Sequence, residues 1–240
     1  MFSCLIILIA AIVMGMTGFG FALIIIPLFL LFMDAKVVVV YNIVLGTIVC
    51  IPVLWQSRKY LKFSKITILV VSCILGLPVG IYILSHVSSP VLKLLIASMV
   101  IIFALLLALG ISYKFKREWI GFIVSGLIGG MLMPSIGLGG PPVILFLINQ
   151  DWEKNVFRAN LNAFFIIIGI ATFLAMGASR VVNTNTILTS FILVPPLLIG
   201  VFIGLKLLPR IDSVWFKRIS TGVLILSGVL GVVNVLMVLL

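Results

Sequence analysis

The stretches Gly15-Met-Thr-Gly-Phe-Gly-Phe21 and Gly129-Gly-Met-Leu-Met-Pro-Ser-Ile-Gly-Leu-Gly-Gly-Pro-Pro142 decide how this chain can fold. Each lies inside a run of about 30 apolar residues, whereas a membrane helix needs only about 20 to cross the hydrocarbon. Glycine and proline weaken a helix, and unwound backbone at that depth survives only where protein or a wet cavity satisfies its polar groups. We therefore expect two broken helices that together form a transport site.

The composition indicates an integral membrane protein. Of the 240 residues, 64% are hydrophobic and only 9% are charged, whereas soluble domains carry about 25% charged residues. The net charge of +11 would suggest nucleic acid in a soluble protein, but here the cations lie in short links between apolar runs. Lys and Arg in the links between membrane helices set the orientation of the protein in the membrane, which explains these cations. We expect a lipid bilayer around the chain and no nucleic-acid partner.

Eight apolar runs follow one another along the chain, and the first and fifth are the long, broken ones. This order predicts two membrane repeats of four elements, 1–113 and 117–240. Shifts of 119, 118 and 124 residues bring like residues of the two halves together. The matched pairs are Gly18 with Gly137, Gly20 with Gly139, Asn42 with Asn160, Gly76 with Gly200, and Gly80 with Gly204. The last two pairs form Gly-xxx-Gly patterns, which predict helix-packing faces.

The positions of Lys and Arg predict the orientation. If all eight runs cross once, each side receives eight cations and no bias remains. If the fifth run returns to the face it entered, thirteen cations lie inside and only Lys36, Lys93 and Arg180 lie outside. We therefore expect an all-α polytopic membrane protein with two inverted repeats, each beginning with a glycine-broken re-entrant or hairpin helix.

The second glycine-broken stretch is the stronger candidate for a binding site. Proline lacks an amide, so Pro141 or Pro142 suits the first position of a half-helix. Free amides at such a helix end, with the helix dipole behind them, attract an anion, and small glycines let backbone approach it closely. The candidate residues of the two stretches are Thr17, Gly18, Gly20, Gly137, Gly139, Gly140 and Pro141. The alternative is that these glycines only let helices pack or kink.

Three polar residues open the sixth run, in the segment Phe157-Arg-Ala-Asn-Leu-Asn-Ala163. Arg158 and Asn162 are four residues apart and share a helix face, so their donors would suit an oxyanion. The alternative for Arg158 is an anchor at the membrane surface. For Asn42 and Asn160 the alternative is a hydrogen bond between helices. Their matched positions favour a shared site on the axis between the repeats.

Catalysis has little support in the sequence. The metal-binding, nucleophile-elbow and phosphate-loop motifs are all missing, so we expect no enzyme, catalytic residue, metal or cofactor. The five acidic residues lie in links or at the ends of runs. This argues against a cation pathway, which places carboxylates within the membrane, and suits an anionic substrate.

The glycine motifs together resemble those of the TauE/SafE sulfite-exporter family of membrane permeases. The resemblance rests on Gly15-Met-Thr-Gly-Phe-Gly with the apolar run to Pro27, on Gly-Leu-Gly-Gly-Pro-Pro, and on Phe157-Arg-Ala, and it covers nearly the whole chain. It implies a multi-pass carrier of sulfite or organosulfonates in the inner membrane of a bacterium or archaeon. It also implies that Gly18, Gly20, Gly137, Gly139 and Gly140 form the glycine-rich breaks, and that Arg158 is the family's arginine.

We interpret the chain as a secondary transporter that moves small anions, most of all sulfite or organosulfur anions, by alternating access at half-helix N-termini. Two alternatives remain: a carrier of another organic acid or metabolite, and a non-transporting membrane scaffold. The sequence leaves open whether a proton or sodium ion is coupled to transport, and whether the protein is a homodimer.

The inverted arrangement predicts the sidedness of three links. Cysteines introduced at Lys36 and Asn183 should react with an impermeant reagent from outside, and one at Ser112 should react only from the cytoplasm. The reason is that the fifth run changes no side. Labelling of intact cells and of inverted vesicles measures this, and cytoplasmic reaction at position 36 would contradict the arrangement.

Overall fold

The computed structural model is helical throughout the part of the chain that it describes, residues 2–108, 117–148, 150, 152–179 and 184–208. Its helices are α1 Phe2–Thr17, α2 Phe21–Leu30, α3 Ala35–Ser57, α4 Thr67–His86, α5 Ser89–Ala108, α6 Glu118–Ile136, α7 Gly140–Ile148, α8 Lys154–Ala178, α9 Thr184–Ile192 and α10 Val194–Leu207. Two 3₁₀ turns, η1 Arg58–Tyr60 and η2 Phe63–Lys65, join α3 to α4. The predicted eighth run, 214–240, and the link positions 112 and 183 lie outside the described residues.

Four of the described helices, α3, α4, α6 and α8, are long and apolar enough to cross a membrane. A fifth span results if α9 and α10, which meet at 45°, count as one. That bend was not predicted from the sequence, and it has a local cause. Pro195 and Pro196 lie at the start of α10, where their missing amides and their rings cannot continue the turn of α9. The chain is therefore an all-helical, multi-pass membrane protein.

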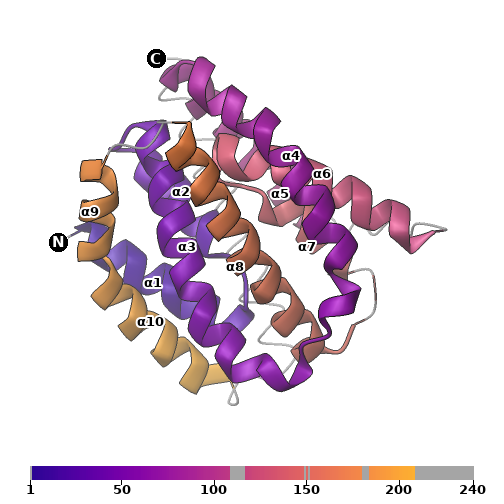
Figure 1. Ribbon diagram of the computed structural model, residues 1–240. Helices are drawn as coiled ribbons and strands as arrows, with labels where there is room; N and C mark the ends of the chain where they lie inside the picture. The colour runs from indigo at the N-terminus through magenta and orange to yellow at the C-terminus, as the bar shows by residue number, and fades with distance from the viewer. Residues whose placement is uncertain (1, 109–116, 149, 151, 180–183, 209–240) are drawn as a thin grey trace.

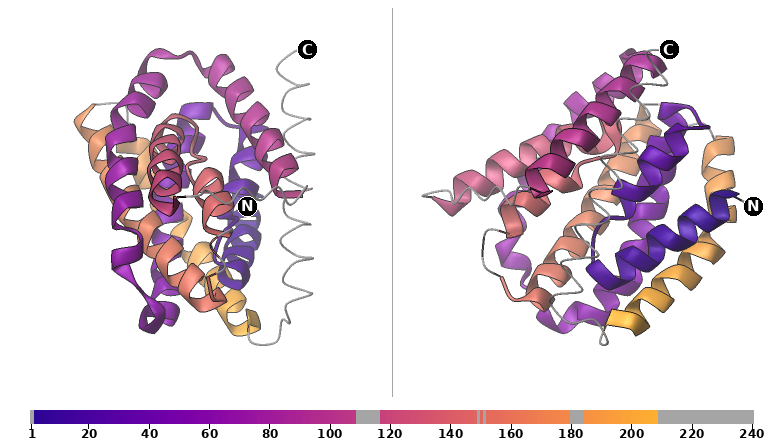
Figure 2. Two further views of the ribbon diagram at one scale, coloured as in Figure 1. Left: turned by 90° about the vertical axis from the view of Figure 1, so that its right-hand side faces the viewer. Right: turned by 180° about the vertical axis from the view of Figure 1, so that it is seen from behind.

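Helices α3 and α8 pack against each other at the centre of the fold (Figure 1). Helix α1 packs along α10 on one side of this pair, and α4 packs along α6 on the other (Figures 1 and 2). Each flanking pair thus joins a helix of the first half to one of the second half. The arrangement places the link between α1 and α2, and the link between α6 and α7, beside the central pair.

The predicted glycine packing faces are confirmed by these contacts. A Cβ at Gly76 would lie 2.5 Å from the carbonyl oxygen of Leu127, and a Cβ at Gly200 would lie 2.5 Å from that of Leu8. One turn further on, Gly80 meets the Met131 carbonyl in the same way. Only glycine allows backbones to approach so closely, which is how helices associate without a hydrophobic driving force.

Each broken run begins and ends in the same region of the protein. The rings of Phe2, at the start of α1, and Phe32, just after α2, lie 5.8 Å apart. Glu118, at the start of α6, and Trp152, after α7, line one polar groove together with Lys65. The Lys65 ammonium also lies 5.1 Å from the centre of the Trp152 ring. In each of these two runs the start and the end therefore lie close together.

Substitution of Gly80 by alanine should separate α4 from α6, because the added methyl group would overlap the backbone of Met131. We expect a loss of about 1–3 kcal/mol, as for overpacked cores. Thermal unfolding in detergent should show a lower Tm. The matched control is Gly177→Ala in α8, where a Cβ meets nothing within 4 Å. Equal Tm values for the two variants would contradict the packing role.

Candidate functional site

The two helix breaks begin with the same local geometry. Gly18 and Gly137 adopt left-handed φ angles of 81° and 75° just after α1 and α6. Their amides donate back to the carbonyls of Met14 at 2.7 Å and Met133 at 3.1 Å. A left-handed glycine of this kind is a common way to end a helix, because glycine has no Cβ to clash in that conformation. Helices α1 and α6 therefore end at left-handed glycines.

A carboxamide from the central helix pair holds each of these glycines. Asn42 Nδ2 in α3 donates to the Gly137 carbonyl at 2.9 Å, and Asn162 Nδ2 in α8 donates to the Gly18 carbonyl at 3.1 Å. Each bond joins one half of the chain to the break in the other half. Because a carbonyl freed from a helix needs a partner at this depth, these amides fix where each break lies.

The hydrogen bonds match Asn42 with Asn162, whereas the sequence comparison matched it with Asn160. Asn160 has a different role: its Oδ1 accepts a hydrogen bond from the Lys62 amide at 3.1 Å. Its Nδ2 donates to the Val156 carbonyl within α8. Asn160 therefore ties α8 to the link between α3 and α4. This contact joins a helix to a link, so it differs from the hydrogen bond between helices that the sequence left open for Asn160.

Arg158 lies inside the protein with 1% of its surface exposed, so it is not a surface anchor. Its Nη1 donates to the Met16 carbonyl at 2.7 Å and its Nη2 to the Gly15 carbonyl at 3.0 Å. These carbonyls belong to the last turn of α1, where the helix dipole is negative and favours a cation. In this conformation the guanidinium therefore holds the end of α1, with both terminal nitrogens engaged.

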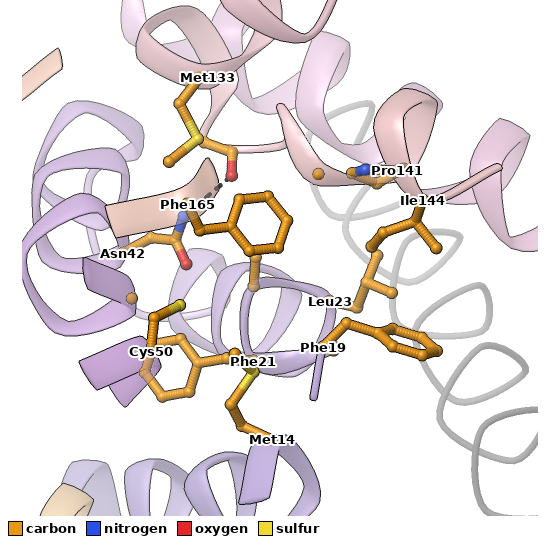
Figure 3. Close-up of a pocket in the computed structure, with 15 residues that line it drawn as sticks. Met14, Phe19, Phe21, Leu23, Asn42, Cys50, Met133, Pro141, Ile144 and Phe165 are labelled. Atoms are coloured by element: carbon orange, nitrogen blue, oxygen red, sulfur yellow. Dashed lines mark hydrogen bonds between the residues drawn. The ribbon is translucent and has the colours of Figure 1, made fainter. Parts of the chain in front are cut away.

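A cavity of about 60 Å³ lies between the two breaks (Figure 3). Residues 19–23, from the first break into α2, form much of its wall. The remaining wall comes from Asn42, Gly46 and Cys50 of α3, Gly140, Pro141 and Ile144 of α7, and Met14, Met133, Gly137 and Phe165. A single water needs about 10–15 Å³ of such space, so the cavity has room for a ligand of a few heavy atoms.

The cavity meets the N-termini of α2 and α7, and the two offer different numbers of donors. At α2, the amides of Phe21 and Ala22 have no acceptor within their own helix, because they belong to its first turn. Helix α7 begins at Gly140, one residue earlier than predicted, so Pro141 and Pro142 occupy its first turn without amides. The first break therefore offers more free amides than the second. Which break contributes more to substrate binding stays a prediction.

Five of the eleven predicted site residues line the cavity: Gly20, Asn42, Gly137, Gly140 and Pro141. The other six lie around it. Gly18 and Asn162 contact each other beside Arg158. The Thr17 hydroxyl donates a hydrogen bond to the Val13 carbonyl at 2.8 Å. Gly139 packs against the Gly129 backbone, and Asn160 contacts the link at Lys62. Contact of any of these eleven residues with a substrate stays a prediction.

Sequence reasoning missed the apolar wall of the cavity. Met14 and Met133 lie one turn before the two left-handed glycines, and Phe165 and Cys50 face the space from the central helices (Figure 3). Such residues look like ordinary membrane-helix residues in a sequence. The available signal was the offset of 119 residues, which places Met14 on Met133.

These features define a class: a multi-pass helical membrane protein with an internal cavity. The particular family follows from comparison with known proteins. The family model described as sulfite exporter TauE/SafE matches residues 3–230, and the chain belongs to this family of membrane transporters.

One curated relative is the probable sulfite/organosulfonate exporter TauE of Cupriavidus necator. It is 27% identical over 154 residues, which is 62% of this chain. The match spans 60% of the length of that relative. No solved structure matches the chain.

Replacement of Arg158 by methionine should destabilise the end of α1, since two buried carbonyls would lose their donor. Each unpaired group costs about 1–3 kcal/mol. Arg158→Lys should restore part of the loss, because it keeps the charge at the helix end but offers no planar fork. Thermal unfolding of the purified variants measures the order wild type, then lysine, then methionine. Methionine as stable as wild type would show that Arg158 does not hold α1.

Proposed function

We propose that this protein is a secondary transporter that carries small anions, sulfite or organosulfur anions, by alternating access. The observation that carries the proposal is the cavity at the N-termini of α2 and α7, lined by both helix breaks. Helix N-termini attract anions, and discontinuous helices that meet near the midplane form the substrate sites of many secondary transporters. Family membership supports the substrate class.

An inverted repeat is part of the proposal, and the contacts support it. Gly76 meets Leu127 as Gly200 meets Leu8, and these pairs differ by the offsets of 124 and 119 residues found in the sequence. The Asn42 bond to the second break and the Asn162 bond to the first break follow the same exchange of halves. A two-fold relation between the halves would produce both patterns.

The two hairpins support opposite orientations for the repeats. The α6–α7 hairpin has its open end beside Lys62 and Lys65, in the polar groove that also contains Glu118 and Trp152. The open end of the α1–α2 hairpin lies at Phe2 and Phe32. Close to it, Asp34 accepts a hydrogen bond from Ser89. These are the two faces that the charge distribution assigns to the inside and the outside.

Helix lengths support a site near mid-membrane. Helices α2 and α7 contain 10 and 9 residues, so each spans about 14–15 Å, half of a hydrocarbon core of about 30 Å. Helix α6, with 19 residues, is long enough to cross alone. A half-helix that starts at the midplane points its N-terminal amides at the centre of the bilayer, where little else competes for an anion.

Alternating access would use the breaks as hinges. Each break is held by one carboxamide from the opposite half, through Asn42 and Asn162. A rocking motion of one half against the other would move these amides together with the central pair α3 and α8. The left-handed glycines would absorb the change in backbone angle, which is why hinges often lie at such residues.

The proposal includes a location in the inner membrane of a bacterium or archaeon. The acids within the described residues lie at the ends of helices, as Asp34 does at the start of α3. This favours an anion path through the centre. A carrier for another organic acid would use the same cavity, and a scaffold would have no use for it.

Flux measurements in proteoliposomes should separate these functions. We expect saturable uptake of labelled sulfite or a sulfonate, with weaker uptake of carboxylates of similar size. Gly46→Leu should reduce it at least about ten-fold, because the side chain fills the cavity. A Cβ there lies 3.8 Å from its nearest neighbours, so the helix accepts it without a clash, and replacing glycine within a helix favours folding by up to about 1 kcal/mol.

The control is Gly177→Leu, which lies in open space on α8 and should leave flux unchanged. Undiminished flux in Gly46→Leu would place the pathway elsewhere. Preferred transport of carboxylates would favour the organic-acid carrier. Absence of flux for every anion would favour the scaffold.

A further inference from the structure

The cavity contains one polar atom that the proposed anion site does not explain. Asn42 is 3% exposed, and its Oδ1 is buried with no hydrogen-bond partner among the described residues. The amide nitrogen is fixed on the Gly137 carbonyl. A flipped amide would set two oxygens against each other, so the hydrogen bond assigns the oxygen to the cavity side.

The oxygen of Asn42 points into the space between Phe165 and Cys50 (Figure 3). It is an acceptor in a wall that is otherwise largely apolar. An unpaired acceptor in such surroundings is costly, and a ligand that donates a hydrogen bond to it removes that cost. An oxyanion without a hydrogen-bond donor would instead place its own lone pairs against those of the Asn42 oxygen, and the two would repel.

The charge available to a ligand points to a single negative charge. None of the described residues that line the cavity is charged. The charge of Arg158 lies outside this lining, and its terminal nitrogens bond to the carbonyls that end α1, where the negative end of the helix dipole offsets part of that charge. The two helix N-termini at the cavity each contribute roughly half a positive charge. Together they balance about one negative charge, so a dianion would be less well compensated than a monoanion.

We propose that the cavity selects small monoanions that carry a hydrogen-bond donor, with the donor received by Asn42 Oδ1 and the anionic oxygens by the first-turn amides of α2. The inference rests on the proposed transport function and narrows its substrate class. Hydrogen sulfite and amino- or hydroxy-substituted sulfonates belong to this class. Sulfate and unsubstituted sulfonates do not.

Asn162 provides an internal comparison. It also donates to a left-handed glycine and also has a buried Oδ1 without a partner among the described residues. Its side chain does not line the cavity, because Arg158 packs beside it against Gly18. Loss of either amide removes one bond to a break, but only loss of Asn42 removes the acceptor from the cavity.

Three ligands of similar size test the inference at one pH: sulfamate, a monoanion with an N–H donor; methanesulfonate, its isostere without a donor; and sulfate, a dianion. Each competes with labelled sulfite uptake by full-length protein in proteoliposomes. Sulfamate should inhibit at a concentration at least about ten-fold lower than methanesulfonate, and sulfate should inhibit least. In Asn42→Leu this preference should disappear, and in Asn162→Leu it should persist at reduced flux.

The wild-type protein alone can overturn the inference, even if a variant fails to fold. Equal inhibition by sulfamate and methanesulfonate would do so, as would no inhibition by either while sulfite is carried. A preference that survives in Asn42→Leu would overturn the role of Asn42. Absence of sulfite uptake, and of uptake of every other anion, would instead overturn the proposed transport function.

Discussion

The fold depends on how two interrupted helices satisfy their backbone within an apolar protein. A backbone carbonyl that loses its partner at a helix break finds no water to hydrogen-bond with inside a membrane, so a side chain must donate to it. Asn42 and Asn162 supply that partner, each from the opposite half of the chain. Because both residues lie on the central pair, α3 and α8 must cross beside both breaks. The close glycine contacts of α4 with α6 and of α10 with α1 then hold the hairpins in place.

The two breaks are alike in backbone but not in surroundings, and this difference creates the cavity. Beside the first break, Arg158 fills the space next to Gly18 and holds the end of α1. With Asn42 matched to Asn162, the counterpart of Arg158 is Val38, a small buried residue. Among the described residues, no cation therefore lies beside the second break, and the space lies on the side of Asn42. If the halves are related as proposed, their site is asymmetric.

The sequence predicted the parts of this structure that depend on glycine. A glycine in the middle of a long apolar run signals a break, and a Gly-xxx-Gly pair signals a close helix contact, because both follow from the missing Cβ. The partner of Asn42 could not be predicted in the same way. Asn160 and Asn162 are two residues apart, and only the register of α8 decides which one reaches a glycine carbonyl. Thin similarity between the halves leaves that register open.

The burial of Arg158 and the apolar wall of the cavity could not be predicted from the sequence for a related reason. An arginine at the end of an apolar run can face the membrane surface or the protein, and the choice depends on whether a helix end lies within its reach. Here the end of α1 does, and its carbonyls take both terminal nitrogens. In the proposed transporter, a substrate would meet a cavity whose described lining carries no charge, and the attraction for its anionic group would come from the N-termini of α2 and α7. Such a site binds an anion without holding it as tightly as a paired arginine would, which suits a carrier that must also release its cargo.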